Sequence, residues 1–304
     1  MKRKAGNILS LSSFSVLVLK TLGKSPVFVL QGFSRVAFFV LYYIVRYRKD
    51  VIGENLRNAF PGKPEKELRR IRKLYYRHLS VLFFEALHLL KIKPADASQW
   101  LELENFDLVQ RYIDDNRDIA LTTGHYGNWE MLPLLQPLVD AQGLAVYKPV
   151  HNEAMNTFMK SLRERYGAKA VPMRMIIRYL SEYRRNNIRT FTLYIIDQTP
   201  HRDEIEYCLR FLNRPAAVFL GPEKIARKWN HVVLYAGMER QGFARYKIKF
   251  HLVTDEPDKL PPYEITKRYT RLLEKDILEA PQYWLWSHRR WKYSEKCNSL
   301  KEKN

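Results

Sequence analysis

Cysteine is scarce in this sequence, and the patterns that identify most disulfide-rich and zinc-binding proteins are missing. The 304 residues include only two cysteines, Cys208 and Cys297, which lie far apart and outside any paired motif. They provide neither a disulfide framework nor a zinc site, so we expect two free thiols in a reducing, cytosol-facing environment. No internal repeat or low-complexity tract is visible, and nearly half of the residues are apolar, which is not the composition of a disordered chain.

Common catalytic and nucleic-acid-binding motifs are also absent. No G-x-S-x-G occurs, so a covalent serine mechanism has little support. The H-E-x-x-H motif of metalloproteases is absent as well. The eight histidines are scattered, and we predict no metal site. No helix-turn-helix, RRM or zinc-finger pattern accompanies the basic residues, which argues against a nucleic-acid partner.

Acidic residues are too few to balance the basic ones. The chain has 52 lysines and arginines against 32 acidic residues, which gives a formal net charge of +20. A charge of this size indicates a polyanionic partner, namely nucleic acid, an anionic membrane surface or an acidic protein. The length is sufficient for one large domain or two small ones with a sizeable core.

The N-terminus favours a membrane among these partners. "MKRK" precedes an apolar stretch over residues 8–22, and a second stretch over residues 26–45 has about the length of a transmembrane helix. Arg35 lies near its middle, where a charge costs on the order of 3 kcal/mol, and we expect Gln31 and Ser34 on the same helix side. The segment therefore either spans the bilayer or lies in its interface. The alternative is a buried helical hairpin of a soluble domain.

The rest of the chain alternates between strand and helix patterns. Pro64 and the helical spacing of apolar residues after it predict one long helix. Beyond that helix, strands are expected at residues 118–124, 144–150, 189–196, 231–238 and 244–253, and helices at residues 129–139, 153–167, 173–187, 221–230 and 264–280. This order predicts an α/β fold with a mixed, mostly parallel sheet flanked by helices and an antiparallel pair at its end. We expect an N-terminal membrane anchor over residues 1–50 and one α/β domain over residues 51–304.

His125 and Glu130 stand in "TTGHYGNWEM", where the first of these strands turns into a helix. Residues five apart on one helix are about 140° out of phase, so the pair can meet only if His125 lies in the loop before the helix. Gly124 and Gly127 permit such a tight path. A carboxylate near the helix start can fix the imidazole tautomer and leave the other nitrogen as a general base. Taken alone, this pattern favours a capping histidine and a helix-start carboxylate.

Six segments in order resemble the late acyltransferases of lipid A biosynthesis, which transfer lauroyl or myristoyl chains. They are "VIGENLRNAFP", "TTGHYGNWEM", "VYKPVHNEAMNTFMKSLRERYGAKAV", "LYIIDQTP", "FLNRPAAVFLGPEKIARK" and "APQYWLWSHRRWK". The H-x4-E pattern is also similar to that of the glycerolipid acyltransferases, whose α/β fold the resemblance implies. The implied reaction moves a fatty acyl chain from acyl–acyl carrier protein to a hydroxyl of a lipid A precursor. The implied location is the bacterial inner membrane, with the site facing the cytoplasm and no metal or nucleotide cofactor.

The resemblance also implies roles for individual residues. His125 would deprotonate the acceptor hydroxyl, and Glu130 would orient His125 and stabilise its charged form. Asp197 and Gln198 follow an apolar strand at the ligand edge of the sheet and would line the acceptor site. A turn-forming aspartate before Pro200 is the alternative for Asp197.

Three further basic residues are candidates for the substrate site. Arg163 and Arg165 in "LRERYG" are suited to bind phosphate groups, because a guanidinium fork matches phosphate geometry; solvated helix arginines are the alternative. Lys148 stands where an arginine is common in the family. A lysophospholipid or aminolipid acyltransferase with the same histidine and glutamate, and a basic membrane- or nucleic-acid-binding protein without catalysis, remain the competing functions.

Overall fold

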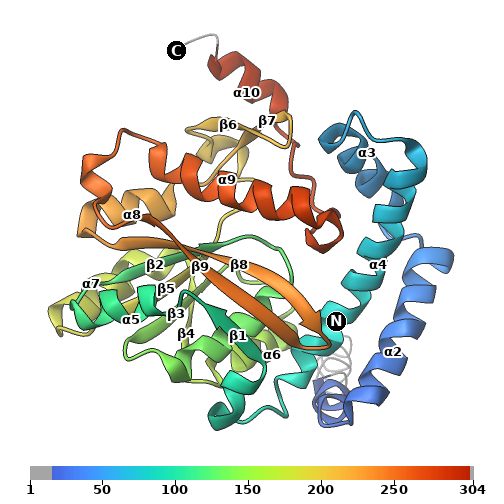
Figure 1. The fold of residues 1–304 in the computed structure, drawn as a ribbon, viewed down its shortest axis with the longest axis horizontal. Coiled ribbons are helices and arrows are strands. Elements are labelled where there is room, and N and C mark those ends of the chain that lie inside the picture. Colours follow the sequence, from blue (N-terminus) through green and yellow to red (C-terminus); the bar gives the residue numbers. More distant parts are fainter. Residues whose placement is uncertain (1–15, 302–304) are drawn as a thin grey trace, which may run out of the picture.

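A computed structural model of the chain describes residues 16–301 and shows a seven-stranded sheet beside a layer of N-terminal helices (Figure 1). The strands lie in the order β1-β9-β8-β2-β5-β3-β4, and the named neighbours are parallel except for the antiparallel pair β8–β9. This confirms the predicted fold class. The strands are β1 (Leu101–Glu104), β2 (Ile119–Thr123), β3 (Gln142–Tyr147), β4 (Lys169–Pro172), β5 (Thr190–Ile195), β8 (Val232–Gly242) and β9 (Arg245–Thr254).

The helices expected from the sequence are present, with one change of type. The α-helices are α2 (Val27–Phe39), α3 (Lys49–Ala59), α4 (Glu65–His88), α5 (Asp107–Asp114), α6 (Glu153–Glu164), α7 (Ile176–Arg185), α8 (Gly221–Trp229), α9 (Glu264–Glu279) and α10 (Ser294–Lys301). The segment η3 (Trp129–Leu138) is a 3-10 helix with Pro133 and Pro137 inside it. Each proline lacks the N–H that a regular α-helix requires at these positions.

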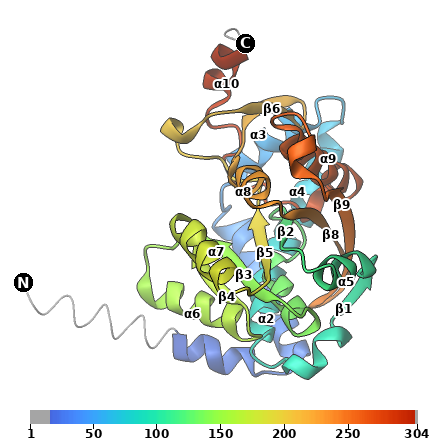
Figure 2. The ribbon, with the colours of Figure 1, turned by 90° about the vertical axis from the view of Figure 1, so that its left-hand side faces the viewer.

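Several short elements were not expected from the sequence. They are α3, the edge strands β1 and β4, α5, α10 and the antiparallel hairpin of β6 (Cys208–Phe211) and β7 (Arg214–Ala217). The four strands among them have four residues each, which is too short for a period-2 pattern to be recognised. The hairpin and α10 lie together at one end of the molecule (Figure 2).

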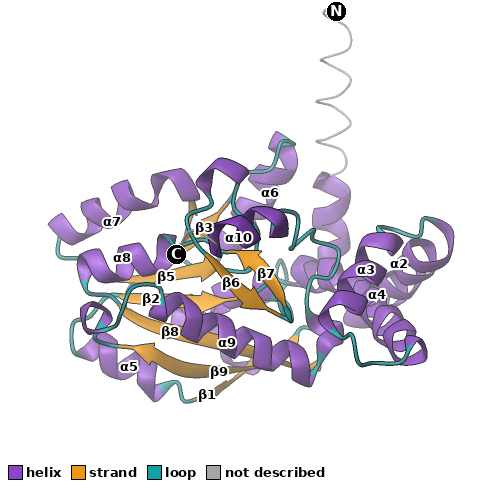
Figure 3. Ribbon diagram, turned by 90° about the horizontal axis from the view of Figure 1, so that it is seen from above, coloured by secondary structure: helices purple, strands orange, loops and turns teal. Residues whose placement is uncertain are grey.

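Helices cover both faces of the sheet. Leu121 and Leu193 are register partners that line an apolar cavity beside η3. Tyr235 points to the other face, where its hydroxyl donates to the carboxylate of Asp276 on α9 at 2.6 Å. Seen from above, the strands from β3 to β1 succeed one another behind α9 and the β6–β7 hairpin (Figure 3).

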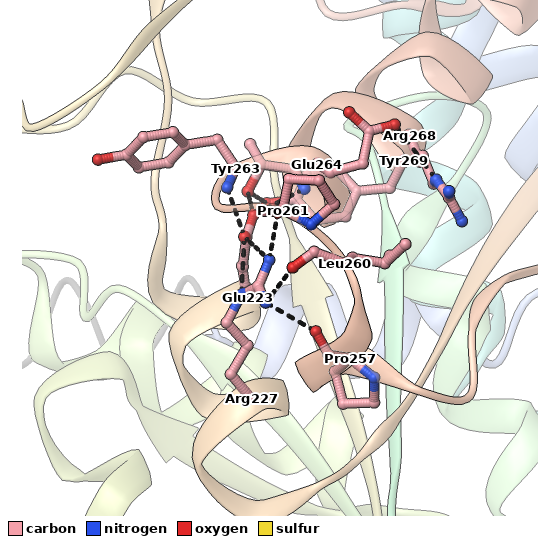
Figure 4. Close-up of polar contacts among 10 residues, drawn as sticks. Glu223, Arg227, Pro257, Leu260, Pro261, Tyr263, Glu264, Arg268 and Tyr269 are labelled. Carbon is pink, nitrogen blue, oxygen red and sulfur yellow. Dashed lines mark hydrogen bonds and ion pairs between the residues drawn. The ribbon is translucent and has the colours of Figure 1, made fainter.

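A buried carboxylate joins α8 to the start of α9 (Figure 4). Glu223 is 3% exposed and accepts hydrogen bonds from the amides of Tyr263 and Thr266 and from the guanidinium of Arg227. Arg227 also donates to the carbonyls of Pro257, Leu260 and Pro261. Because both charges are paired and hydrogen-bonded, this network holds the loop before α9 without a buried unpaired charge.

The N-terminal helix α2 packs on α4 and leaves its other side exposed (Figure 1). The segment Val27–Ile44 is long and apolar enough to cross a membrane, and only 11% of it is buried. Its exposed side carries large apolar residues, such as Phe28, Val36 and Phe39, which are 55–72% exposed. Such a surface differs from that of a buried hairpin and suits contact with lipid. The "MKRK" segment lies outside the described residues, as do residues 8–15 of the first apolar stretch.

One detail of this helix differs from the expectation. Ser34 does not share the exposed side with Arg35: it is 4% exposed, and its hydroxyl donates to the carbonyl of Gln31 at 2.8 Å. The backbone bond satisfies the hydroxyl, so a serine fits against α4. Arg35 is exposed on the outer side.

The prediction of two free thiols was wrong, because Cys208 and Cys297 form a disulfide across 89 residues of sequence. It joins β6 to α10, and the Cys297 side of the bond is fully buried. The sequence separation concealed a contact that the fold creates, since the β6–β7 hairpin returns the chain beneath the C-terminal helix. The cysteines therefore no longer support a reducing compartment.

We expect the disulfide to stabilise the folded chain by about 2–4 kcal/mol, because it closes a long loop and restricts the unfolded state. Thermal unfolding in detergent with and without dithiothreitol measures the effect. The unfolding temperature of the wild type should fall on reduction, whereas that of a Cys208→Ala/Cys297→Ala variant should not respond. Equal responses of the two proteins would contradict the bond.

Candidate active site

His125 and Asp197 are brought together by the register of two neighbouring parallel strands. Thr123 is the register partner of Ile195 at the ends of β2 and β5, and the amide of Ile196 donates to the carbonyl of Thr123 at 2.9 Å. His125 and Asp197 each follow the end of their strand by two residues. They therefore meet at the carboxyl edge of the sheet, where open α/β folds bind their ligands.

Asp197 binds both the side chain and the backbone of His125. Its Oδ1 lies 2.6 Å from Nδ1 of the imidazole, and its Oδ2 accepts from the backbone amide of His125 at 3.0 Å. Trp284 adds a third donor, with its indole Nε1 2.7 Å from Oδ2. Burial alone would raise the pKa of Asp197, but the charge of His125 and these hydrogen bonds outweigh it and lower the pKa to about 2.

An ionised carboxylate can only accept hydrogen bonds, so it fixes the tautomer of His125. When the ring is neutral, Nδ1 therefore carries the proton that faces Asp197, and Nε2 has a free lone pair. Gln198 lies at this second nitrogen, with its side-chain Nε2 3.0 Å from Nε2 of His125. Trp129 packs edge-on against the imidazole, and only 12% of the His125 side chain is exposed. The site thus contains one imidazole nitrogen that can act as a base, on a side chain that is largely buried.

Glu130 does not make the predicted contact with His125. Its two oxygens accept from Nε and Nη2 of Arg163, at 2.9 and 2.5 Å, and Trp129 donates its indole N–H to Oε1 at 3.2 Å. Asp197 occupies the place beside His125 for which the sequence predicted Glu130. The sequence signal for Asp197 was its position after a strand, which placed it at the correct edge but did not identify its partner.

Of the three predicted basic residues, one contacts Glu130 and the other two do not. Arg163 is half-buried from α6, packs over the ring of Tyr147, and has a raised pKa because the charge of Glu130 outweighs the cost of burial. Its guanidinium fork is occupied by Glu130 rather than facing outwards. Arg165 and Lys148 are exposed, near the ends of α6 and β3, and have no ion-pair partner in the described part of the chain. Within residues 16–301, no group of three or more histidine, cysteine or acidic side chains is arranged to hold a metal ion.

The loop between His125 and Glu130 is held from α4. His78 is buried, and its Nε2 donates to the carbonyl of Gly127 at 3.0 Å; burial lowers its pKa to about 3. Asn128 caps η3 through the amide of Glu130 and donates to the fully buried carboxylate of Glu85 at 3.1 Å. These bonds satisfy the polar groups of a turn that lies inside the protein, and so fix its path.

Two glycines of this loop have close neighbours at the position of a Cβ. Gly127 has a φ of +60°, which disfavours other residues, and an added Cβ would lie 3.0 Å from the Cβ of Met238. At Gly124 an added Cβ would come within 2.5 Å of Leu273 on α9. The prediction that both glycines permit the tight path is consistent with these contacts, although only Gly127 needs the left-handed conformation.

The C-terminal segment "YWLWSHRRW" lies against the same loop. Tyr126 forms a bridge with Trp284, and the amide of Leu285 donates to the carbonyl of His125 at 3.1 Å. Asn55 on α3 donates to the carbonyls of Trp286 and His288 at 2.8 and 2.9 Å. Trp284, Trp286 and Arg290 are at most 1% exposed, so these residues belong to the interior rather than to a surface in contact with headgroups.

The arrangement supports proton abstraction from a bound hydroxyl or amine. A histidine whose Nδ1 proton is held by a buried carboxylate can present Nε2 as a base, and a carboxylate in this position can stabilise an imidazolium. The side chain of His125 hydrogen-bonds to Asp197 and Gln198 and to no serine or cysteine in the described residues, so no protein nucleophile is positioned there for the base to activate.

Comparison with known proteins gives a match over almost the whole chain. The family described as bacterial lipid A biosynthesis acyltransferase matches residues 4–293. A lipid A biosynthesis palmitoleoyltransferase of Escherichia coli (strain K12) is 21% identical over 255 residues, which cover 82% of this chain and 80% of the relative. A lipid A biosynthesis acyltransferase of Shigella flexneri is similar to the same extent, with 21% identity over 255 residues. The family match includes both the N-terminal helices and the sheet that carries His125.

We expect Gly127→Ala to destabilise the protein by about 1–2 kcal/mol, because the new side chain must adopt a left-handed conformation against Met238. The change in unfolding temperature measures this cost. Gly62→Ala is the matched control, since nothing lies within 4 Å of its Cβ position. Equal effects of the two substitutions would show that the loop does not need its left-handed glycine.

The stabilising contribution of Asp197 should depend on pH. The folded-state pKa of about 2 lies below the ordinary value of 3.8, so the contribution is complete above about pH 4 and is lost as the pH falls towards 2. The destabilisation caused by Asp197→Asn should therefore shrink by about 2 kcal/mol between pH 6 and pH 2. Denaturant unfolding across this range measures it, with Asp203→Asn, whose side chain is 83% exposed, as the control. A pH-independent effect of Asp197→Asn would overturn the assignment.

Proposed function

Since the chain belongs to the bacterial lipid A biosynthesis acyltransferase family and is an acyltransferase, we propose that it transfers a fatty acyl chain from acyl–acyl carrier protein to a hydroxyl of a lipid A precursor. The observation that carries the mechanism is the pair of His125 and Asp197, which leaves one imidazole nitrogen poised as a base. Acyl transfer between a thioester and a hydroxyl needs such a base, because a neutral hydroxyl is a weak nucleophile.

In this mechanism His125 acts first as a base and then as an acid. Nε2 takes the proton of the acceptor hydroxyl while the hydroxyl oxygen adds to the carbonyl carbon of the thioester. The electron pair of the C=O double bond moves to the carbonyl oxygen. The tetrahedral intermediate collapses to the new ester and breaks the carbon–sulfur bond. His125 returns its proton to the leaving sulfur, and Asp197 stabilises the imidazolium between the two steps.

We assign the orienting role to Asp197 and a positioning role to Glu130. Glu130 holds Trp129 through the indole N–H and Arg163 through a two-point ion pair, and Trp129 packs on the imidazole. Removing the Glu130 charge would leave Arg163 half-buried and unpaired, which is costly. Glu130 therefore acts through its neighbours, in contrast to the direct contact that the H-x4-E pattern suggested.

We place the reaction at the bacterial inner membrane, with the site on the cytoplasmic side where the carrier protein is found. Helix α4 contacts the apolar helix α2 and also binds the catalytic loop through His78 and Glu85. Arg48, just after the apolar segment, donates to the carbonyl of Ser287 beside the site at 2.8 Å. One layer of helices thus separates a lipid-compatible surface from the base, which suits an acceptor held in the membrane. We assign the site to the cytoplasmic side because the proposed donor, acyl–acyl carrier protein, is found there. The two cysteines do not support this assignment, because they form a disulfide.

The proposal predicts different losses for three variants in one assay. Membranes from an overexpressing strain receive labelled acyl–acyl carrier protein and a lipid A precursor. His125→Ala should lose about 10²–10⁴-fold in rate because the base is removed. Asp197→Asn should lose a comparable factor because the tautomer is no longer fixed. Glu130→Gln should lose less, because only the positioning of Trp129 and Arg163 is disturbed.

His251→Ala is the matched control, because His251 lies in β9 and makes no contact with His125 in the described structure. Parallel reactions with acyl–coenzyme A and with lysophospholipid or aminolipid acceptors identify the donor and the acceptor. Full activity of His125→Ala would refute the mechanism. Transfer by the wild type to a phospholipid acceptor alone would refute the lipid A assignment and leave the base in place.

A further inference from the structure

The basic nitrogen of His125 has a protein side chain within hydrogen-bond distance. When the ring is neutral, Asp197 holds the proton on Nδ1, so Nε2 has one lone pair and can accept one strong hydrogen bond. The side-chain amide nitrogen of Gln198 lies 3.0 Å from this lone pair. A hydroxyl or a water molecule can transfer its proton to Nε2 only after the amide has moved away.

The rest of the imidazole offers no second route to this nitrogen. Asp197 covers Nδ1, the ring of Trp129 lies 4.6 Å away centroid to centroid, and the His125 side chain is 12% exposed. The occupied position of the Gln198 amide is therefore also the position that the acceptor hydroxyl has to take.

Gln198 is held in reach of the base but is not fixed there. Its neighbour Asp197 is bound by three donors, and the hydroxyl of Thr199 donates to the carbonyl of Arg290 at 2.7 Å, so the side chains of both neighbouring residues are held in place. The Gln198 side chain is half-buried and has no second hydrogen-bond partner in the described structure. Rotation about its side-chain bonds is enough to uncover Nε2.

We propose that Gln198 gates the general base: its amide occupies Nε2 of His125 until the acceptor hydroxyl replaces it, and so keeps water from attacking the bound thioester. An acceptor lipid contacts the protein through many groups, and this binding energy can displace the amide. A water molecule brings only its own hydrogen bonds. The gate therefore favours transfer over hydrolysis.

The competing reaction that the gate suppresses is thioester hydrolysis by the same base. Water gives a proton to Nε2, its oxygen adds to the thioester carbonyl, and collapse breaks the carbon–sulfur bond. His125 returns the proton to the sulfur, and the products are a free fatty acid and a thiol. The same bonds form and break as in acyl transfer, with water in place of the acceptor hydroxyl. This part of the inference rests on the proposed function.

The first test measures access to Nε2 without any substrate. Diethyl pyrocarbonate modifies unprotonated imidazole nitrogens, and peptide mass spectrometry follows each histidine in the full-length protein. His125 should react roughly 2- to 10-fold faster in Gln198→Ala than in the wild type, the factor that one neutral hydrogen bond sets. His201, whose side chain is 68% exposed, is the internal control and should react equally in both proteins. Equal rates at His125 would overturn the gate, whatever reaction the protein catalyses.

The second test measures the ratio of free fatty acid to acylated lipid formed from acyl–acyl carrier protein. This ratio should rise in Gln198→Ala, by a factor similar to the one seen in the modification test. An unchanged ratio, with both products falling together, would overturn the gate and indicate an amide that stabilises the oxyanion. His125→Ala should form both products about 10²–10⁴-fold more slowly.

The wild type separates the failure of the gate from that of the proposed function. If the wild type acylates no lipid A precursor, the proposed acceptor is wrong. The modification test, and the hydrolysis rate without acceptor, still decide whether Gln198 covers the base.

Discussion

The parallel pairing of β2 with β5 is the constraint on which the site depends. It fixes Thr123 beside Ile195. The chain continues for two residues beyond each of these strand ends, which places His125 beside Asp197. Neither side chain is useful alone: the carboxylate needs donors to remain ionised in the interior, and the imidazole needs an acceptor to fix its proton. A shift of one residue in this register would turn one of the two side chains away from the other.

Buried polar contacts from the N-terminal helices complete this arrangement. His78 and Glu85 on α4 bind the loop that carries His125, and Asn55 on α3 binds the C-terminal segment that supplies Trp284. Such groups are costly to bury unless they are satisfied, so each bond fixes a single geometry. The helices that carry the apolar surface and the helices that hold the loop of His125 are therefore one structural layer, which links the proposed membrane contact to the proposed reaction.

Charge is used differently inside and outside this layer. Inside, the acidic side chains around the site are paired or hydrogen-bonded, as in the contacts of Glu130 with Arg163 and of Glu85 with Arg240 and Tyr246. The exposed excess of basic residues is the part that remains available to an anionic surface or an acidic carrier protein. The net charge by itself does not distinguish these partners, whereas the lipid-compatible face of α2 favours a membrane.

The sequence by itself determined the long elements, the edge of the sheet at which the site lies, and the loop position of His125. Hydrophobic periodicity, the proline before α4 and the glycines around His125 are local signals, so they are legible without the fold. It also placed Asp197 and Gln198 at that edge. It paired His125 with Glu130, however, because it contained no information on which strands are neighbours.

Only the tertiary structure decided the partners. Asp197 lies 72 residues from His125, Arg163 lies 33 residues from Glu130, and Cys297 lies 89 residues from Cys208. Contacts over such separations follow from strand order, register and the packing of helices on the sheet, and many arrangements of the same elements would satisfy the local pattern equally well. The short edge strands and the β6–β7 hairpin are settled in the same way, because their pairing partners and not their own sequences make them strands.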